Sequence, residues 1–240
     1  MIIANMATYP KRVSSLSLVI ERLLPQVDIL NIVLNEYQSI PLECRREKVM
    51  PIIVGDDLKD TGKFYPESSK AKYVFLVDDD ILYPVDYVEK TIARYENLKY
   101  ESCMASYYGS IYMRPSLYDY LRRPFLSLEF RKHLVKFRKV YHYKDKLRDE
   151  VVVDQLGSGV AILRGKDMPP YEYMKNAKRF CDVRLAKWCY EMKIIKVCLP
   201  RECGWLDDVS YDETIFRGFT KKSNCEVNKE ILSYAYKNKN

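Results

Sequence analysis

The chain has 240 residues, of which 48% are apolar and 30% charged, so its composition is that of a folded globular protein and excludes a disordered one. Its net charge of +7 suits anionic ligands such as nucleotide diphosphates, nucleic acid or an acidic membrane surface. No apolar run is long enough to span a bilayer, and the first residues lack the features of a signal peptide, so we expect a cytoplasmic protein.

Strands that alternate with helices are predicted over the first hundred residues. The run MIIANMA indicates a buried strand, and a helix is expected after Pro10 because apolar residues recur at helical spacing up to Leu24. The unbroken apolar run YVFLV is typical of a parallel strand that is covered on both faces. Further elements are expected as strands at 29–35, 49–54, 73–77 and 103–108 and as a helix that opens at Pro84. This order predicts an α/β fold with a mostly parallel central sheet flanked by helices.

The second half of the sequence is less regular and begins with a basic segment. Residues 122–148 contain ten Lys or Arg residues among apolar ones. Two interpretations remain open, a solvated helical hairpin over the core or an amphipathic helix at a membrane surface. No recognisable nucleic-acid-binding module is present, so nucleic acid is not an expected partner. The later elements are expected as a turn and strand at 157–165, a helix at 181–192, a strand at 194–200 and a polar tail from Lys221 with a short helical patch.

Scarce residue types narrow the chemistry. The seven cysteines are odd in number and form no C-x-x-C pair, which favours reduced thiols over a disulfide framework or a zinc site. Only two histidines are present, so a carboxylate is the expected general base at neutral pH. The eight glycines form neither of the glycine-rich motifs that bind dinucleotides or triphosphates.

Polar residues follow several of the expected strands, and in a parallel sheet such residues share one crevice beyond the strand ends. Three adjacent carboxylates, Asp78, Asp79 and Asp80, come directly after YVFLV. They are compatible with a solvated turn, but apolar residues follow at once, and a hard cation such as Mg²⁺ or Mn²⁺ would offset their mutual repulsion. The other strand ends carry Ala7, Thr8, Asn35, Asp56 and Asp57.

Three further motifs each have a structural and a functional interpretation. In VGDDLKDTGKFYPE, Lys63 is either part of a charged loop or one of several polar residues that line a binding site, where it would bind a phosphate or a uracil carbonyl. In DQLGSGVAILRG, the glycines beside Ser158 either shape a tight turn or let the backbone approach a sugar ring. Asp182 either caps the helix that begins there or takes a proton from an acceptor hydroxyl.

The ordered set of motifs resembles nucleotide-sugar glycosyltransferases of the GT-A fold, in particular the family 2-like bacterial and viral enzymes that build surface glycans. The resemblance covers roughly residues 6 to 194. The matching pieces are MATYPKRVSSLSLVIERLLPQVDILNIVLN, GDDLKDTGKFY, KYVFLVDDDILYPVDYVEK, GSIY, DQLGSGVAILRG and CDVRLAKWCYEMKI. It implies a Rossmann-like central sheet with a nucleotide-sugar-binding half at 1–110, an acceptor-binding and catalytic half of the same domain at 111–220, and a C-terminal tail at 221–240.

The resemblance also implies a role for individual residues. Asp78 to Asp80 match the D-x-D element, with Asp80 as metal ligand and Asp78 facing the ribose or the metal. Asp182 occupies the position of the catalytic base in inverting members. The residues expected around the nucleotide and the donor sugar are Thr8, Tyr9, Arg12, Asn35, Asp57, Lys63, Asp79, Gly109, Ser110, Gly157, Ser158 and Gly159.

The reaction implied is a metal-dependent single displacement with inversion. Asp182 would deprotonate a hydroxyl of a glycan or lipid-linked glycan acceptor, and the diphosphate of a donor, best matched by a UDP-sugar, would depart with Mn²⁺ or Mg²⁺. Contact with the inner face of a membrane is expected through residues 122–148. No histidine follows His142 to complete a metal shell, so the cation would rest on Asp80, diphosphate oxygens and water, or on a late carboxylate, Asp207 or Asp208.

Two other functions compete with this interpretation. Four apolar residues followed by DDDIL also match haloacid-dehalogenase-type phosphatases, in which Asp78 would be the nucleophile and Asp80 the acid/base, with Asp207 and Asp208 as late metal ligands. In that family the motif lies near the N-terminus, whereas here three expected strands precede it. The third possibility is a protein that has the glycosyltransferase fold and binds nucleotide sugars but does not catalyse transfer.

Overall fold

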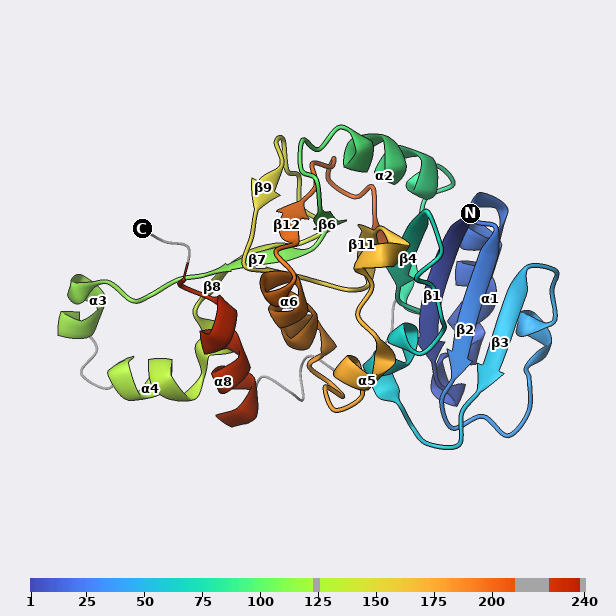
Figure 1. Ribbon diagram of the computed structural model, residues 1–240, viewed down its shortest axis with the longest axis horizontal. Helices are drawn as coiled ribbons and strands as arrows, with labels where there is room; N and C mark the ends of the chain where they lie inside the picture. Colours follow the sequence, from blue (N-terminus) through green and yellow to red (C-terminus); the bar gives the residue numbers. More distant parts are fainter. Residues whose placement is uncertain (123–125, 210–224, 238–240) are drawn as a thin grey trace.

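An eight-stranded mixed sheet runs through the centre of the protein (Figure 1). The computed structural model describes residues 1–122, 126–209 and 225–237. The strand order is β3-β2-β1-β4-β11-β6-β12-β9, and four of the neighbouring pairs are parallel, namely β3/β2, β2/β1, β1/β4 and β6/β12. The strands are β1 (Ile2–Thr8), β2 (Ile29–Leu34), β3 (Val49–Ile53), β4 (Tyr73–Val77), β6 (Cys103–Ser106), β9 (Val151–Val152), β11 (Val160–Leu163) and β12 (Ile195–Cys198). The predicted α/β class with a large, mostly parallel sheet is confirmed.

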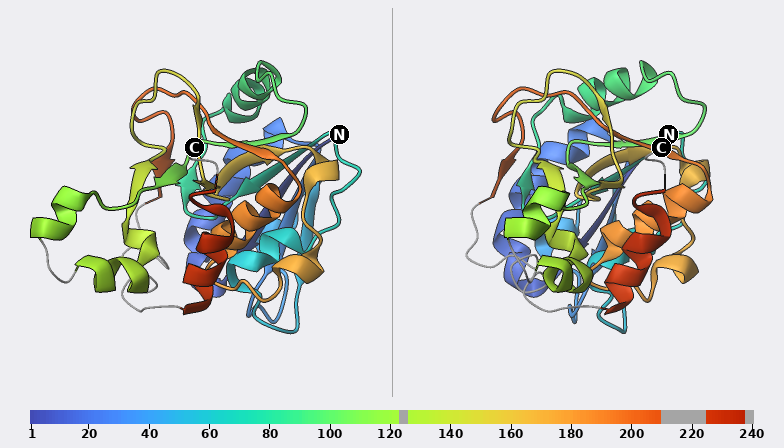
Figure 2. Two further views of the ribbon diagram at one scale, coloured as in Figure 1. Left: turned by 60° about the vertical axis from the view of Figure 1, so that its left-hand side comes forward. Right: turned by 90° about the vertical axis from the view of Figure 1, so that its left-hand side faces the viewer.

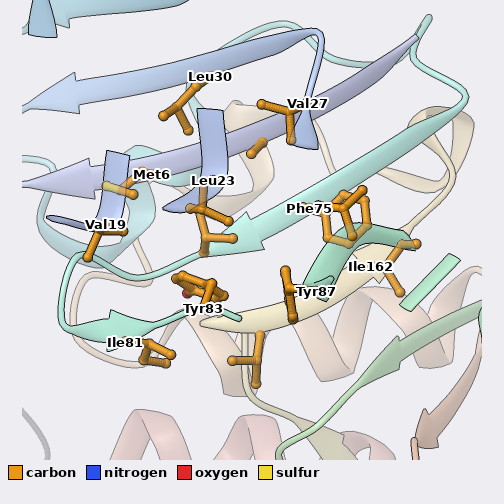
Figure 3. Close-up of a cluster of buried hydrophobic side chains, with 14 of the residues drawn as sticks. Met6, Val19, Leu23, Val27, Leu30, Phe75, Ile81, Tyr83, Tyr87 and Ile162 are labelled. Carbon is orange, nitrogen blue, oxygen red and sulfur yellow. The ribbon is translucent and has the colours of Figure 1, made fainter. Parts of the chain in front are cut away.

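Helices cover both faces of this sheet, because the central strands β1, β2, β4 and β11 bury side chains on both sides. On one face lie α1 (Val13–Leu23) and α2 (Tyr87–Glu96), whose apolar residues pack on Met6 and Phe75 (Figure 3). On the other face lie α5 (Tyr171–Met174) and α6 (Cys181–Glu191), which pack on residues such as Leu76 (Figure 2). The first-half strands and helices predicted from periodicity are confirmed to within a few residues.

The sheet contains one insertion that the sequence did not predict. Strand β11 lies antiparallel between β4 and β6, with Val160 opposite Val77 and Ala161 opposite Ser106. The strand expected at 103–108 therefore does not neighbour the one at 73–77, and it ends at Ser106. Because β11 runs backwards, the turn that precedes it lies at the carboxyl end of β4. The chain continues from β6 into a separate three-stranded sheet of β10 (Gln155–Leu156), β7 (Gly109–Tyr112) and β8 (Arg138–Tyr141).

The basic segment forms short elements instead of one amphipathic helix. Helices α3 (Leu117–Arg122) and α4 (Leu126–Lys132) lie at one end of the molecule, away from the main sheet (Figure 1). The prediction of a helix or helical hairpin over the whole segment is wrong at 138–141, which pair with β7 as strand β8. Residues 123–125 lie outside the described part, and membrane contact stays a prediction. Among the described residues no helix has both the length and the apolar character needed to cross a bilayer.

The C-terminal helical patch is helix α8 (Cys225–Tyr234), and it packs directly on α6. Val227 and Ile231 are buried in the same cluster as Val183. Arg184 on α6 donates to both carboxylate oxygens of Glu230, from its Nε at 2.8 and 2.9 Å. Residues 221–224 of the predicted tail lie outside the described part. The described part of this segment therefore belongs to the packed domain.

Candidate active site at the carboxyl end of strand β4

The three adjacent aspartates that follow β4 enter three different environments. The carboxylate of Asp78 forms an ion pair with Lys63, and 40% of the Asp78 side chain is exposed. Asp79 is buried. The carboxylate of Asp80 lies 3.1 Å from Arg12 NH1. Two of the three charges are therefore offset by cationic side chains of the protein itself.

Lys63 is the buried centre of a connected polar network. Its ammonium group donates to Asp78 and lies 3.3 Å from both the carbonyl oxygen and the hydroxyl of Ser158. The Ser158 N–H in turn donates to Asp182 Oδ1 at 2.9 Å. Although burial opposes it, the carboxylate of Asp78 raises the pKa of Lys63 above its ordinary value. The network thus joins residues from four segments, and it brings Lys63, Asp78, Ser158 and Asp182 together as the sequence predicted.

Gly159 is required because the carboxylate of Asp78 occupies the place where a side chain would begin. A Cβ at position 159 would lie 2.0 Å from Asp78 Oδ2 and 2.7 Å from its Cγ. The main chain of Asp78 is also fixed in place. Its N–H donates to the Tyr83 hydroxyl at 2.8 Å, and that hydroxyl donates to the Gly159 carbonyl at 2.5 Å. Close approach, rather than an unusual backbone angle, explains the glycine here.

Replacing Gly159 with alanine should displace the Asp78 carboxylate and destabilise the fold. We expect the free energy of unfolding to fall by about 2 kcal/mol, as for other overpacked sites. Gly55→Ala is the matched control, because nothing lies within 4 Å of a Cβ at that position. Urea unfolding followed by circular dichroism measures both changes. Equal stability of the Gly159 and Gly55 variants would show that Asp78 can move aside freely.

Asp80 lies in a cluster of negative charge that extends to a late strand. Strand β13 (Asp207–Asp208) pairs with β5 (Ile81–Leu82), and the Val209 N–H donates to the Asp80 carbonyl at 2.8 Å. Burial raises the pKa of Asp80, the charges of Asp78 and Asp208 raise it further, and Arg12 and Lys63 lower it. An additional cation would relieve this repulsion.

A divalent cation fits this position only as a complex with a ligand. Among the described residues no group of three or more His, Cys, Asp or Glu side chains could hold a metal by itself. Asp207 and Asp208 both form ion pairs with Lys144, and Asp208 also accepts a hydrogen bond from the Tyr143 hydroxyl. Mg²⁺ commonly uses one or two carboxylates and completes its shell with phosphate oxygens and water. The carboxylates of Asp78 and Asp80 fit that mode and not a closed protein cage.

Asp79 is the buried member of the triplet and faces the end of β1. Burial raises the pKa of Asp79 to about 7, although the neighbouring Thr8 hydroxyl and Arg12 lower it. Thr8 is itself buried, and it also lies next to the Tyr37 hydroxyl. Burial therefore favours the protonated form of Asp79 more strongly than in an exposed aspartate.

The remaining residues expected around a nucleotide lie at the ends of β1 and β2. Asn35 Oδ1 accepts from the Leu58 N–H at 2.9 Å and its Nδ2 donates to the Lys59 carbonyl at 3.2 Å, so the amide fixes the following loop. Asp57 accepts from the Lys59 N–H and side chain; these bonds outweigh burial and lower the pKa of Asp57. The Arg12 guanidinium lies 5.8 Å from the centre of the Tyr9 ring.

Asp182 begins helix α6 but does not cap it. The main chain at the helix start instead donates to Asp60, from the N–H groups of Arg179 at 2.5 Å and Cys181 at 3.3 Å. Asp182 instead faces the Lys63 network. Burial raises the pKa of Asp182, and the charge of Asp78 adds to this, whereas Ser158 and Lys63 lower it. A carboxyl group with a raised pKa is suited to take a proton near neutral pH.

Two glycines of the expected site play packing roles, one of them away from the carboxylate network and one beside it. A Cβ on Gly109 would lie 3.1 Å from Cys198 and 3.2 Å from Val153, so this strand residue is packed against the core. Ser110 beside it is buried and accepts a hydrogen bond from Arg138 at 3.4 Å. The structure does not bring Gly109 to Asp78. Gly157 does border the network, and its missing side chain leaves room for the Tyr108 ring.

Sequence reasoning missed residues that orient the network. Tyr83 holds the main chain of Asp78, Asp60 accepts from the main chain just before α6, and Tyr143 binds Asp208. A tyrosine five residues after Asp78 gives no signal by itself, because its role depends on how β11 returns to β4. Comparison with protein-family models finds no match to this chain, and comparison with curated proteins finds no significant match. The functional argument therefore rests on the residues of the site.

Proposed function

We propose that the protein is a metal-dependent inverting glycosyltransferase that moves a sugar from a nucleotide diphosphate, best matched by UDP, to a hydroxyl of a glycan or lipid-linked glycan. One observation carries the proposal: Asp182 lies in the same polar network as the Lys63–Asp78 ion pair, joined to it through Ser158. A base on one side and a charge-neutralising group on the other are what displacement at an anomeric carbon requires.

Each charged residue of the network has a separate task in this reaction. Asp182 receives the proton of the attacking hydroxyl, and its raised pKa makes it a stronger base than an exposed aspartate. Lys63 and Arg12 supply positive charge where the departing diphosphate gains negative charge. Lys63 also orients Ser158, whose N–H fixes Asp182. The residues prepare opposite charges in fixed positions before the substrates bind.

The divalent cation would be held by Asp80 and Asp78 together with the diphosphate oxygens. When bound, Mn²⁺ or Mg²⁺ would supply Lewis-acid stabilisation of the leaving group. Support comes from the pKa of Asp80, which burial raises and which the negative charges of Asp78 and Asp208 raise further. The nucleotide would lie toward Thr8, Tyr9, Arg12 and Asn35, at the ends of β1 and β2. The reaction would take place in the cytoplasm, with the basic segment 122–148 turned to a membrane-borne acceptor.

Binding of a nucleotide diphosphate together with Mn²⁺ is the first expected result. A ligand that binds the native state raises its melting temperature, so thermal unfolding should be measured with UDP, GDP, CDP and dTDP, each with and without Mn²⁺. We expect the largest rise with UDP and Mn²⁺. Asp80→Asn should remove the Mn²⁺-dependent part of the rise, whereas Asp149→Asn, at an exposed position, should retain it.

The same measurement separates the competing functions. A rise with UDP that is equal with and without Mn²⁺ would overturn the metal part of the proposal and assign the diphosphate to Arg12 and Lys63. No rise with any nucleotide would favour the phosphatase, for which release of phosphate from a generic phosphomonoester and its loss in Asp78→Ala is the next test. Nucleotide binding without hydrolysis or transfer across a panel of UDP-sugars and acceptors would indicate a binding protein.

A further inference from the structure

Three aromatic rings from two distant segments meet beside the active site, and we call Tyr108, His142 and Tyr143 the aromatic ledge. The rings of His142 and Tyr143 are 4.4 Å apart between centres and tilted by 32°. Tyr108 meets His142 edge-on at 5.4 Å and Tyr143 at 6.3 Å. All three side chains are half-buried, so part of each remains open to solvent.

One end of the ledge borders Asp182. A Cβ on Gly157 would lie 2.9 Å from the Tyr108 ring, so that ring lies directly against the turn whose next residue binds Asp182. The turn is fixed to Tyr108 by the main chain as well, since the Gly157 N–H donates to the Tyr108 carbonyl at 2.9 Å. Burial raises the pKa of Tyr108, and the charge of Asp182 adds to this effect.

The other end of the ledge reaches the metal-binding carboxylates. The Tyr143 hydroxyl donates to Asp208, which lies opposite Ile81 in the β13–β5 pair. Burial raises the pKa of Tyr143, as do the charges of Asp208, Asp80 and Asp78. The ledge therefore extends from the proposed base to the proposed cation site.

The ledge is held in place before any ligand binds. The buried guanidinium of Arg201 donates to the carbonyl of His142, and also to those of Asp145 at 2.9 Å and Leu199 at 3.0 Å. Burial lowers the pKa of His142, so the imidazole is neutral at pH 7. A fixed, uncharged aromatic surface binds the apolar face of a ligand with little loss of conformational entropy.

The order of the strands indicates which ligand the ledge meets. Thr8 and Asn35 follow β1 and β2, on one side of β4, whereas Tyr108 follows β6, two strands away on the other side. The nucleotide and the ledge therefore belong on opposite sides of Asp78. Resting on the proposed function, we propose that the aromatic ledge is the acceptor subsite and that it binds the pyranose ring of a carbohydrate acceptor by stacking, with the attacking hydroxyl turned toward Asp182.

Saturation-transfer NMR with simple sugars tests this subsite without an activity assay. The probes are the methyl β-glycosides of glucose, galactose and N-acetylglucosamine, each added to the protein with UDP and Mn²⁺. We expect ring protons of at least one glycoside to receive saturation from the native protein. Tyr143→Leu should weaken that signal by roughly fivefold because it removes the stacking surface, whereas Tyr143→Phe should retain it. The thermal shift with UDP and Mn²⁺ should be the same in both variants.

The outcomes distinguish this proposal from the function on which it rests. Absence of saturation of every glycoside by a native protein that binds UDP would overturn the acceptor subsite alone. An undiminished signal in Tyr143→Leu would do the same, and loss of the UDP shift in both Tyr143 variants would assign the ledge to the nucleotide. Glycoside binding that depends on Tyr143 in a protein with no nucleotide response would support the ledge and overturn the proposed glycosyltransferase. If Tyr143→Leu is unfolded by circular dichroism, His142→Leu replaces it with the same expectations.

Discussion

Asp182→Asn should lower the rate of glycosyl transfer by about a thousandfold, which lies within the usual contribution of a general base. The asparagine can still accept the hydrogen bond that the Ser158 N–H now gives to Asp182 Oδ1, so the fold and the site geometry should be retained. It cannot take a proton from the acceptor. Donor binding, measured as the thermal shift with UDP and Mn²⁺, should therefore remain unchanged while transfer from a UDP-sugar is lost.

The pH dependence of glycosyl transfer by the native protein provides a second check on the same residue. Burial and the charge of Asp78 raise the pKa of Asp182 above that of an ordinary aspartate. Only the ionised carboxylate can act as base, so the rate should fall as the pH drops through this raised pKa, and it should recover above it. The acid limb of the profile should thus lie above the usual aspartate range and disappear from the residual activity of Asp182→Asn.

Asp149→Asn is the control for the loss of charge. Asp149 is exposed, and its replacement removes the same single negative charge as Asp182→Asn. Its rate and pH profile should match those of the native enzyme. Transfer at the native rate by Asp182→Asn would end the assignment of Asp182 as base. In that case the Lys63 network would be a structural feature, and another acceptor of the proton would have to be sought along the ledge.

Asp78→Asn should destabilise the protein by about 3 kcal/mol, the lower end of the cost of removing one partner of a buried ion pair. The reason is an asymmetry between the partners, since 4% of the Lys63 side chain is exposed but 40% of that of Asp78. Without Asp78 the ammonium group remains buried beside Ser158 and Asp182 only. In Lys63→Met the remaining Asp78 carboxylate can still reach water, so we expect a loss of about 1 kcal/mol or less.

A double-mutant cycle measures this asymmetry. Once Lys63 has become methionine, Asp78→Asn leaves no buried ammonium group behind, so the double variant should be more stable than Asp78→Asn alone and close to Lys63→Met. The coupling should amount to about 3 kcal/mol, at the upper end of the range for residues in direct contact. Urea unfolding of the four proteins gives the values. Additive effects, or a larger loss in Lys63→Met than in Asp78→Asn, would contradict the buried position of the ammonium group.

The position of the acidic triplet could be predicted from the sequence, but its partners could not. An unbroken apolar run followed by Asp78 and its neighbours indicates a buried strand with polar residues at its carboxyl end. Which cations offset those charges depends on tertiary structure. Lys63 lies in the 3₁₀-helix Lys59–Phe64, before β4, and reaches Asp78 only because that segment packs under the ends of β1 and β2.

The role of Asp182 also depends on tertiary structure that the sequence pattern does not predict. The sequence predicts a helix start at Asp182, and the capping interpretation follows from it, yet the N–H groups at this helix start donate to Asp60, in the 3₁₀-helix Lys59–Phe64 more than a hundred residues earlier. The basic segment shows a different limit, because the alternation that makes β8 is short and its strand pairing with β7 is decided by distant residues. Local pattern therefore identified the polar residues, and long-range pairing decided what each of them does.

The antiparallel strand β11 has a consequence for how the protein is made. When the ribosome has synthesised the first 110 residues, β4 has its partner on one side but exposes its other edge, because that partner is encoded at 160–163. Open strand edges recruit foreign strands, so the nascent chain carries an aggregation hazard until the second half emerges. A fragment cut out at residue 110 would carry this open edge permanently. The first 110 residues therefore need strand β11 from the second half to complete their sheet.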